Sequence, residues 1–283
     1  MKLRHALPTL ALFIAALPLP AFAQAPALIE ALKDGSGKRV LVTAHRAAHD
    51  VHPENSMAAI ERAIALGVDI IEIDTRLTKD GVPVLMHDDS VDRTTDGKGK
   101  VKELTFAEIR QLHLKGADGT PNDQRVPTLS EALRAAKGKV LVDLDLKTGD
   151  LEPIISRVIE TDMLDQALFF NGNYAFLEKF RAIAPNLLVF PRAHSTEQAA
   201  TASSSLKPEA IHIDDGFNTD ATHKAALASD SRVWINALGD PDKLVAQGKA
   251  KEAIDPLLAH GASMIQTDHP AAVIAYLKSI GRR

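Results

Sequence analysis

Residues 40–74 read VLVTAHRAAHDVHPENSMAAIERAIALGVDIIEID, and the fold class follows from the pattern within them. The segment begins with a short β-branched run at 40–44, continues with apolar residues at helical spacing over 56–66, and ends in a second apolar run at 69–74. A strand, a helix and another strand in this order predict two parallel strands joined by a helix that covers one face of the sheet.

The same alternation continues to the end of the chain. The elements expected after the first unit are a helix over Leu129–Ala136, a strand over Val140–Leu146, a helix over Leu151–Glu160, strand-plus-helix pairs starting at Leu168, Leu187, Ile211 and Val233, and a last pair over Ser263–Ile280. No linker-like segment interrupts the series. The pattern therefore predicts an α/β protein with one domain over 24–283, a (β/α)₈ TIM barrel.

A ninth strand-like run, VPVLMH, ends at His87 and exceeds the eight strands of a barrel. Only residues 79–81 connect it to the preceding strand, which is too short for a parallel crossover and typical of an antiparallel hairpin. With the turn centred between residues 79 and 80, Glu72 pairs with His87 and Asp74 pairs with Leu85. This geometry places a histidine beside two carboxylates.

Residues 88–127 fit neither a strand nor a barrel helix and are predicted to form an insertion after the second strand. The run at 93–99 is turn-forming, and Thr105–Glu108 is a capping box that opens a helix through Leu112. A second capping box, Thr128–Glu131, opens the next barrel helix. Long insertions in compact domains are often lids or binding loops; the alternative is a surface loop without a role.

Composition excludes several classes of protein. The 283 residues include no cysteine, so disulfide scaffolds and thiolate metal sites are impossible, and any metal must bind to carboxylates, histidines or water. Lys and Arg number 33 against 37 Asp and Glu, and this formal net charge of −4 argues against a nucleic-acid-binding protein.

Residues 1–23 have the pattern of a secretory signal peptide. Lys2 and Arg4 precede an apolar run from Ala6 to Leu19, and Ala21-Phe22-Ala23 is a small-x-small cleavage pattern. Cleavage would leave 260 residues with a net charge of −6, in the periplasm or secreted. The alternative, an uncleaved membrane anchor, is disfavoured by the short apolar run; we expect no stable membrane insertion after cleavage.

Two strands end in acidic residues that share one face. Glu72 and Asp74 alternate with apolar residues on one strand, and Asp143, Asp145 and Lys147 alternate in the same way on another. Inward carboxylates at the carboxyl ends of barrel strands are costly unless a cation neutralises them, so a hard divalent ion is one explanation. The alternative is a salt-bridged rim. The lysine could offset phosphate charge or form an ordinary salt bridge.

A third cluster follows the first strand. His45 lies at the rim where barrel enzymes collect catalytic groups, and Arg46 offers a bidentate fork for a phosphate. Asn55 is expected to cap the first helix. A single histidine at a strand end is more often structural, but His45 and His87 together flank the predicted carboxylate cluster.

These motifs resemble the glycerophosphodiester phosphodiesterase family in order and spacing. The resemblance runs from about Val40 to the C-terminus. It rests on His45-Arg46, Pro53-Glu54-Asn55-Ser56, the run from Gly67 to Asp74, Thr78-Lys79-Asp80-Gly81, His87-Asp88, Asp92-Arg93-Thr94-Thr95 and Thr267-Asp268-His269-Pro270. Each motif alone is weak, whereas the ordered set is specific.

The resemblance implies a role for each candidate residue. It implies that His45 and His87 are the acid/base pair. Glu72 and Asp74 would bind one divalent cation, Ca²⁺ or Mg²⁺, with Asp145 as third ligand where the family has a glutamate. The same resemblance makes Arg46 and Lys147 phosphate-contacting residues and puts Glu54 at the substrate-binding rim.

The chain departs from the family pattern at three places. Ala47 replaces a glycine, and residues 48–50 continue unusually. Asp145 is one methylene shorter than the family's glutamate. Trp234-Ile235-Asn236 replaces Trp-Thr-Val-Asn, so no role is transferred to that asparagine. These departures bear on substrate identity and metal affinity more than on the reaction class.

The sequence therefore predicts metal-dependent hydrolysis of small-molecule glycerophosphodiesters to glycerol 3-phosphate and an alcohol, with two histidines as acid and base. Two alternatives stay open. One is a phospholipase-type phosphodiesterase that acts on lipid headgroups. The other is a barrel that binds a phosphorylated ligand without catalysis. The sequence carries no signal for the oligomeric state.

Overall fold

The structure, a computed structural model, describes residues 24–183, 185 and 187–283. The predicted signal peptide, residues 1–23, lies outside the described residues. A nine-stranded sheet contains eight parallel strands that close on themselves, because β1 pairs with both β2 and β11. The parallel strands are β1 (Leu41–Ala44), β2 (Ile70–Leu77), β6 (Leu141–Leu146), β7 (Ala167–Asn171), β8 (Leu188–Ala193), β9 (Ala210–Ile213), β10 (Arg232–Asn236) and β11 (Met264–Thr267). The predicted (β/α)₈ barrel is confirmed.

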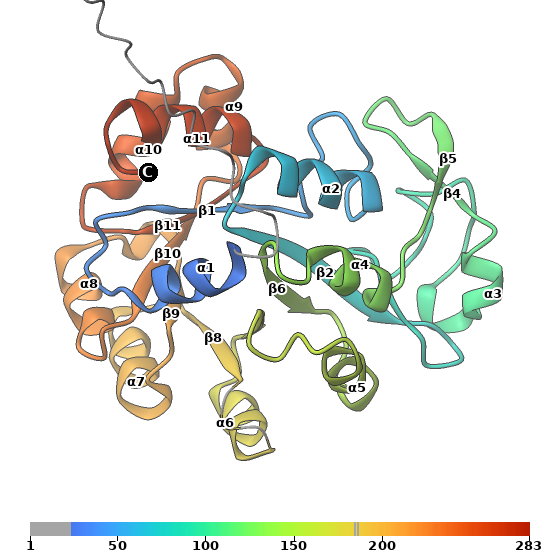
Figure 1. Cartoon of the computed structure of the whole chain (residues 1–283), viewed down its shortest axis with the longest axis horizontal. Coiled ribbons are helices and arrows are strands. Elements are labelled where there is room, and N and C mark those ends of the chain that lie inside the picture. The colour runs from blue at the N-terminus through green and yellow to red at the C-terminus, as the bar shows by residue number, and fades with distance from the viewer. Residues whose placement is uncertain (1–23, 184, 186) are drawn as a thin grey trace, which may run out of the picture.

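Helices surround this barrel (Figure 1). They are α2 (Met57–Leu66), α4 (Leu129–Ala136), α5 (Glu152–Glu160), α6 (Tyr174–Ile183), α7 (Thr196–Leu206), α8 (Asp220–Leu227), α9 (Asp240–Ala246), α10 (Ala250–Leu258) and α11 (Pro270–Ser279). Helix α2 begins where the Ser56 side chain accepts a hydrogen bond from the Ala59 N–H, and ends at Gly67, whose φ of 73° is a left-handed C-cap.

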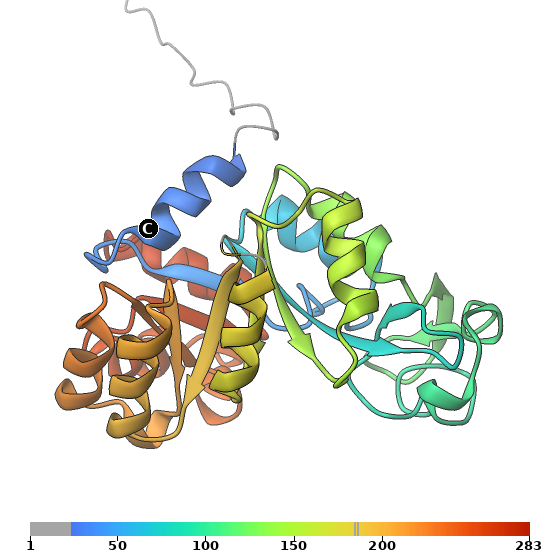
Figure 2. The ribbon, with the colours of Figure 1, turned by 90° about the horizontal axis from the view of Figure 1, so that it is seen from below.

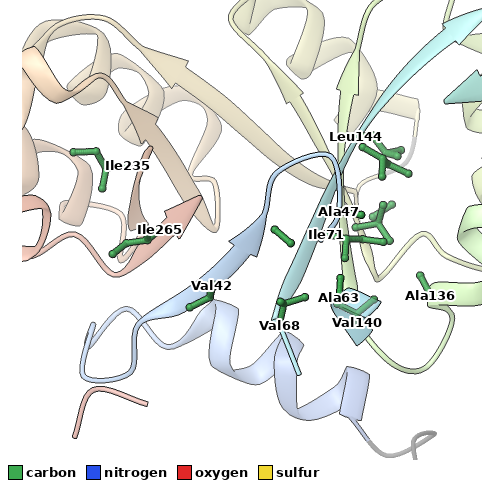
Figure 3. Packing of buried hydrophobic residues seen from close by; sticks show 14 of the residues in the cluster. Val42, Ala47, Ala63, Val68, Ile71, Ala136, Val140, Leu144, Ile235 and Ile265 are labelled. Carbon is green, nitrogen blue, oxygen red and sulfur yellow. The ribbon is translucent and has the colours of Figure 1, made fainter. Parts of the chain in front are cut away.

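The main apolar core lies between the outer face of the barrel and the helices. Figure 3 shows Ile71 of β2 and Leu144 of β6 in this cluster with Ala63 of α2, all fully buried. Because strand side chains alternate, the residues between them, Glu72 and Asp143 among them, point into the barrel. The predicted alternation of apolar and acidic faces is confirmed.

Strand β3 (Pro83–Leu85) is antiparallel to the end of β2, as predicted, but the predicted register is wrong by one residue. Leu85 lies opposite Thr75 rather than Asp74. The turn is centred on Asp80 rather than between residues 79 and 80, because Gly81 adopts a φ of 76° and the Thr78 N–H bonds to the Val82 carbonyl. His87 consequently follows the strand instead of pairing with Glu72.

The segment 88–127 contains η2 (Val101–Glu103), α3 (Phe106–Ile109), β4 (His113–Lys115) and β5 (Pro121–Arg125), and lies to one side of the barrel in Figure 2. Both predicted capping boxes are present. The expectation that this segment holds no strand is wrong, since β4 and β5 pair with each other. It shares a small core with β3 and the residue after β3. This core comprises Val84, Met86, Val91, Val101, Ile109, Leu114 and Val126.

Helix α1 (Gln24–Lys33), which the sequence analysis did not predict, covers the amino ends of the barrel strands (Figure 1). Leu28 and Leu32 pack on a cluster inside the barrel that includes Trp234. The buried Arg232 side chain donates to carbonyl oxygens at the end of this helix, at 2.9 Å from that of Ala31. None of the described helices has the length and hydropathy needed to cross a membrane.

Candidate active site

Three carboxylates meet at the carboxyl ends of β2 and β6. One oxygen each from Glu72, Asp74 and Asp145 lie within 4.8 Å of one another. The parallel register explains this, because Asp74 lies directly beside Asp145. Glu72 and Asp74 are 3% and 1% exposed, so water screens their charges poorly.

The electrostatics of this cluster call for a cation. Burial, together with the charges of Asp74 and Asp145, raises the pKa of Glu72 well above its ordinary value. Burial and the same two neighbours also raise the pKa of Asp143, whose buried Oδ1 makes no hydrogen bond within the described residues. The three clustered donors are all carboxylate oxygens, the donor type that Ca²⁺ and Mg²⁺ prefer, so the residues present fit a hard divalent ion.

Each predicted catalytic histidine has a carboxylate at its Nδ1 atom. His45 Nδ1 lies 2.7 Å from Asp268 Oδ1, and His87 Nδ1 lies 2.9 Å from Asp88 Oδ1. Arg93 in turn bonds to Asp88 at 2.8 Å and, mainly through these bonds, holds the pKa of that carboxyl below its usual range despite its partial burial. A carboxylate at Nδ1 favours the Nδ1–H tautomer and leaves the Nε2 lone pair free to accept a proton.

Sequence reasoning did not assign roles to these two aspartates. Both belong to motifs on which the family resemblance rests, His87-Asp88 and Thr267-Asp268, and this was the signal that could have found them. The residue directly after His87 is a local candidate, whereas Asp268 joins His45 only through closure of the barrel between β1 and β11.

A cavity of about 280 Å³ opens at this end of the barrel. Six of the eight predicted site residues line it: His45, Arg46, Glu72, Asp74, His87 and Asp145. The rest of the wall consists of Asp143, Phe170, Arg192, His212, Asn236, Leu238 and Gln266. Burial, with the nearby charge of Arg192, lowers the pKa of His212 to about 3, so this ring is neutral at physiological pH.

The other two predicted residues do not line this cavity but contact residues that do. Lys147 Nζ lies 2.6 Å from an oxygen of Asp145 and 3.2 Å from one of Asp74. It therefore neutralises part of the carboxylate cluster directly. Glu54 does not line the cavity and instead bonds to Arg46 at 3.0 Å.

Residues 45–205 match the model of the glycerophosphoryl diester phosphodiesterase family. The chain belongs to this family. A glycerophosphodiester phosphodiesterase of Caldanaerobacter subterraneus is 36% identical over 159 residues, 53% of this chain and 65% of that protein. Glycerophosphodiester phosphodiesterase 1 of Mus musculus is 47% identical over 98 residues, 34% of this chain. The matched segments thus span less than two thirds of these relatives, and only 30% of the mouse protein.

Solved structures of family members cover more of the chain. A glycerophosphoryl diester phosphodiesterase from Parabacteroides distasonis superposes with a TM-score of 0.78 at 27% identity, over 91% of this chain and 92% of that one. An Oleispira antarctica phosphodiesterase, solved with the product sn-glycerol-3-phosphate, gives 0.70 at 25% identity, over 86% of this chain and 99% of that one.

Ala47, where the chain departs from the family pattern, lies in an unusual backbone conformation. Arg46 and Ala47 have φ values of 48° and 64°, a left-handed conformation that an alanine adopts at a cost of about 1–2 kcal/mol. The conformation directs the Arg46 N–H to Glu72 Oε2 at 2.7 Å and the Ala47 N–H to the Glu72 carbonyl at 3.0 Å. The backbone after β1 therefore helps to hold a predicted cation ligand of this family member.

The expectation that Asn55 caps helix α2 is wrong. Ser56 is the cap, whereas Asn55 adopts a φ of 55° and its side chain bonds to Asp74. The Asn55 amide donates to Asp74 Oδ2 at 2.8 Å, and its carbonyl oxygen accepts from the Asp74 N–H at 3.1 Å. Asn55 thereby fixes the orientation of one carboxylate of the cluster.

Glu54 links the β1–α2 loop to the insertion. Its carboxylate accepts from Arg46 and, at 2.7 Å and 2.8 Å, from two nitrogens of Arg93. Burial alone would raise the pKa of Glu54, but the bonds from Arg93 and the charge of Arg46 hold it below its ordinary value. Glu54 therefore stays ionised and holds Arg46 in its position in the cavity wall.

Proposed function

We propose that this chain hydrolyses glycerophosphodiesters to glycerol 3-phosphate and an alcohol. The observation that carries the proposal is the presence of two carboxylate-paired imidazoles and a three-carboxylate cluster in one cavity. The Oleispira relative, which was solved with sn-glycerol-3-phosphate, supports the same class of substrate. This activity would make the protein a phosphoric diester hydrolase.

Glu72, Asp74 and Asp145 would hold one divalent cation, Ca²⁺ or Mg²⁺. Such an ion would supply positive charge that offsets the charge on the phosphoryl oxygens. Arg46 and Lys147 would add positive charge at the same place. Lys147 already contacts two of the three carboxylates, so it also limits the negative charge that the substrate meets.

The two histidines would move protons at their Nε2 atoms, because Nδ1 of each is held by a carboxylate. One ring takes the proton from the attacking water and the other gives a proton to the departing alkoxide. Where the neighbouring glycerol hydroxyl attacks instead, water must then open the resulting cyclic phosphate, with the two rings in exchanged roles, to give glycerol 3-phosphate. Each such proton transfer increases the reaction rate by about 10²- to 10⁴-fold. Asp268 and Asp88 orient the rings and stabilise their protonated forms.

The binding roles at the rim follow from the hydrogen bonds. Arg46 is held by Glu54 at one nitrogen, which leaves other guanidinium donors for a phosphate oxygen. Glu54 would thus take part in substrate binding by positioning this arginine. The opposite wall, with Phe170 and Arg192, would contact the alcohol portion of the substrate.

A hydrolysis panel tests the proposal. Purified protein is incubated with glycerophosphocholine, glycerophosphoethanolamine and the intact phospholipids, each with Ca²⁺, Mg²⁺ or EDTA, and glycerol 3-phosphate is measured. We expect release from the glycerophosphodiesters with a divalent ion and none with EDTA. Preferred cleavage of intact phospholipid would support the phospholipase alternative, and binding without release would support the non-catalytic alternative.

We also propose that residues 1–23 are a cleaved signal peptide and that the protein acts in the periplasm or outside the cell. The basic start, the short apolar run and the Ala21-Phe22-Ala23 pattern support this. N-terminal sequencing of the exported protein should find Gln24 as the first residue. An intact start in the cytoplasmic fraction would contradict the proposal.

A further inference from the structure

A second group of potential metal ligands includes His45. The described residues contain two groups of three or more potential metal ligands, namely the carboxylate cluster and the trio His45, His49 and Asp268. His45 and His49 come from the segment after β1, and Asp268 follows β11. One ligand atom of each lies within 4.8 Å of the others.

The spacing of the trio fits a small tetrahedral ion. Asp268 Oδ1 lies 2.7 Å from His45 Nδ1 and 3.5 Å from His49 Nε2. With Zn–N and Zn–O bonds of about 2.0–2.1 Å, tetrahedral donors lie about 3.4 Å apart. The His49 contact already has this length, and the His45 contact needs to widen by less than about 1 Å.

The two rings approach the carboxylate from different directions. Their centroids are 6.0 Å apart and their planes are inclined at 78°. The three side chains are partly buried, at 17% exposed for His45, 22% for His49 and 36% for Asp268. An ion could therefore enter from solvent and retain an open position for water, as zinc sites with three protein ligands do.

The backbone holds the trio in place. The Asp268 N–H bonds to Asp242 Oδ2 at 2.7 Å, and the His45 N–H bonds to the Thr267 carbonyl at 3.2 Å. The site is thus built on the junction of β1 and β11, and only His49 depends on the loop that follows β1.

We propose that His45, His49 and Asp268 form a second cation site, selective for a borderline transition-metal dication such as Zn²⁺, and that its occupation stops hydrolysis. Two imidazole nitrogens and one carboxylate favour such an ion over Ca²⁺ or Mg²⁺, which prefer oxygen donors. The carboxylate cluster has the opposite preference. The two sites thereby separate an activating ion from an inhibiting one.

Inhibition follows from the chemistry of imidazole and rests on the proposed function. An ion bound at Nδ1 of His45 replaces the hydrogen bond between this atom and Asp268, whose carboxylate then binds the ion. The remaining ring proton is thereby fixed at Nε2. That nitrogen then has no lone pair with which to accept a proton. His45 can no longer alternate between acid and base, although the carboxylate cluster remains available.

Zinc binding is tested without reference to activity. The wild-type mature chain, residues 24–283, is saturated with Ca²⁺ and titrated with Zn²⁺ by calorimetry. The variants His49→Gln, His49→Phe and His113→Gln are titrated in the same way. His113 is a matched control, because its Nδ1 lies 2.9 Å from Asp96 Oδ2 in a similar pair without a second histidine in its group. We expect one Zn²⁺ per wild-type chain, affinity at least about tenfold weaker in both His49 variants, and wild-type affinity in His113→Gln.

Hydrolysis of glycerophosphocholine with Ca²⁺ and increasing Zn²⁺ completes the test. Zn²⁺ should inhibit the wild type and His113→Gln, and the His49 variants should resist it. Equal Zn²⁺ binding by wild type and His49 variants, or none by the wild type, would overturn the site. Impaired zinc-free hydrolysis with unchanged Zn²⁺ binding would make His49 a positioning residue instead. Absence of hydrolysis by the zinc-free wild type would refute the proposed function but leave the binding result intact.

Discussion

His45 and Asp268 are 223 positions apart in the chain, and yet His45 Nδ1 lies 2.7 Å from Asp268 Oδ1. The contact exists because β1 and β11 are neighbours in the closed barrel, with Ala44 beside Thr267. His45 is therefore oriented by the residue after the last strand of the fold, Asp268. His87 is oriented by the next residue in the chain, Asp88.

Asp268→Asn should lower kcat more than it raises KM. The amide keeps the shape of the side chain but cannot stabilise a protonated His45 ring, and it favours the wrong tautomer. The fall in kcat should be at least about tenfold. It should not exceed the effect of removing one proton-transfer group, which is about 10²- to 10⁴-fold. Steady-state kinetics over a range of pH checks this. Unchanged kcat would show that the contact has no part in catalysis.

His45→Ala and His87→Ala should each reduce kcat/KM by at least about 10²-fold. Both side chains line the cavity and lie outside the apolar core clusters, so circular dichroism and the melting temperature should change little. Full activity in either variant would refute the acid/base assignment.

The cation-free protein should lose stability as the pH rises above the ordinary carboxyl pKa values and passes the raised ones. Burial raises the pKa of Glu72 and of Asp143 well above the ordinary values of 4.5 and 3.8. A carboxyl with a raised folded-state pKa binds its proton more tightly when folded, so its contribution is full below the ordinary value and is lost as the pH passes the raised one.

Melting temperatures in EDTA and in Ca²⁺ across this pH range measure the effect. A bound cation should remove most of the loss, and an excess of about 100 times its dissociation constant stabilises by about 2.7 kcal/mol. Glu72→Gln should flatten the pH dependence in EDTA and abolish the Ca²⁺ effect. Identical pH profiles with and without Ca²⁺ would contradict a cation site at this cluster.

Asp145→Glu should strengthen cation binding by up to about tenfold, because the longer side chain restores the reach that the family's glutamate has. Calorimetric titration with Ca²⁺ measures the change. Asp150→Glu, on an exposed loop after β6, is the matched control and should bind as the wild type does. Weaker binding by Asp145→Glu would show that the site is adapted to the shorter side chain.

Leu32→Ala should destabilise the fold by about 2–5 kcal/mol, since this α1 side chain is fully buried against the barrel interior. It should leave kcat/KM unchanged, because the cavity lies at the opposite ends of the strands. Leu227→Ala, at a leucine that is 43% exposed, is the control and should change stability by less than about 0.5 kcal/mol. Denaturant unfolding and kinetics of both variants check this.

Patterns that depend on neighbours in the chain predicted the structure well. Helix α4 has the predicted bounds, Leu129–Ala136, and its capping box forms as expected. The alternation around Glu72 and around Asp143 placed four carboxylates inside the barrel, because a buried apolar face leaves only one orientation for the residues between.

The remaining features depend on contacts that the sequence does not encode locally. The hairpin register is set by the hydrogen bond from Thr78 to Val82 and by the left-handed Gly81 between them, which together centre the turn on Asp80. Helix α1 is stabilised by the barrel end that it covers. Arg192 and His212 are single polar residues on their strands, so no spacing marked them before the barrel placed them in the cavity wall.

The two ends of the described chain lie on one face of the molecule. Arg283 bonds to Asp69 and to the Gly67 carbonyl beside the start of β2, on the side that α1 closes. A tag, a surface linker or a fused partner attached at either end would therefore project away from the open mouth. The protein can be immobilised through its termini with the cavity still accessible to small solutes.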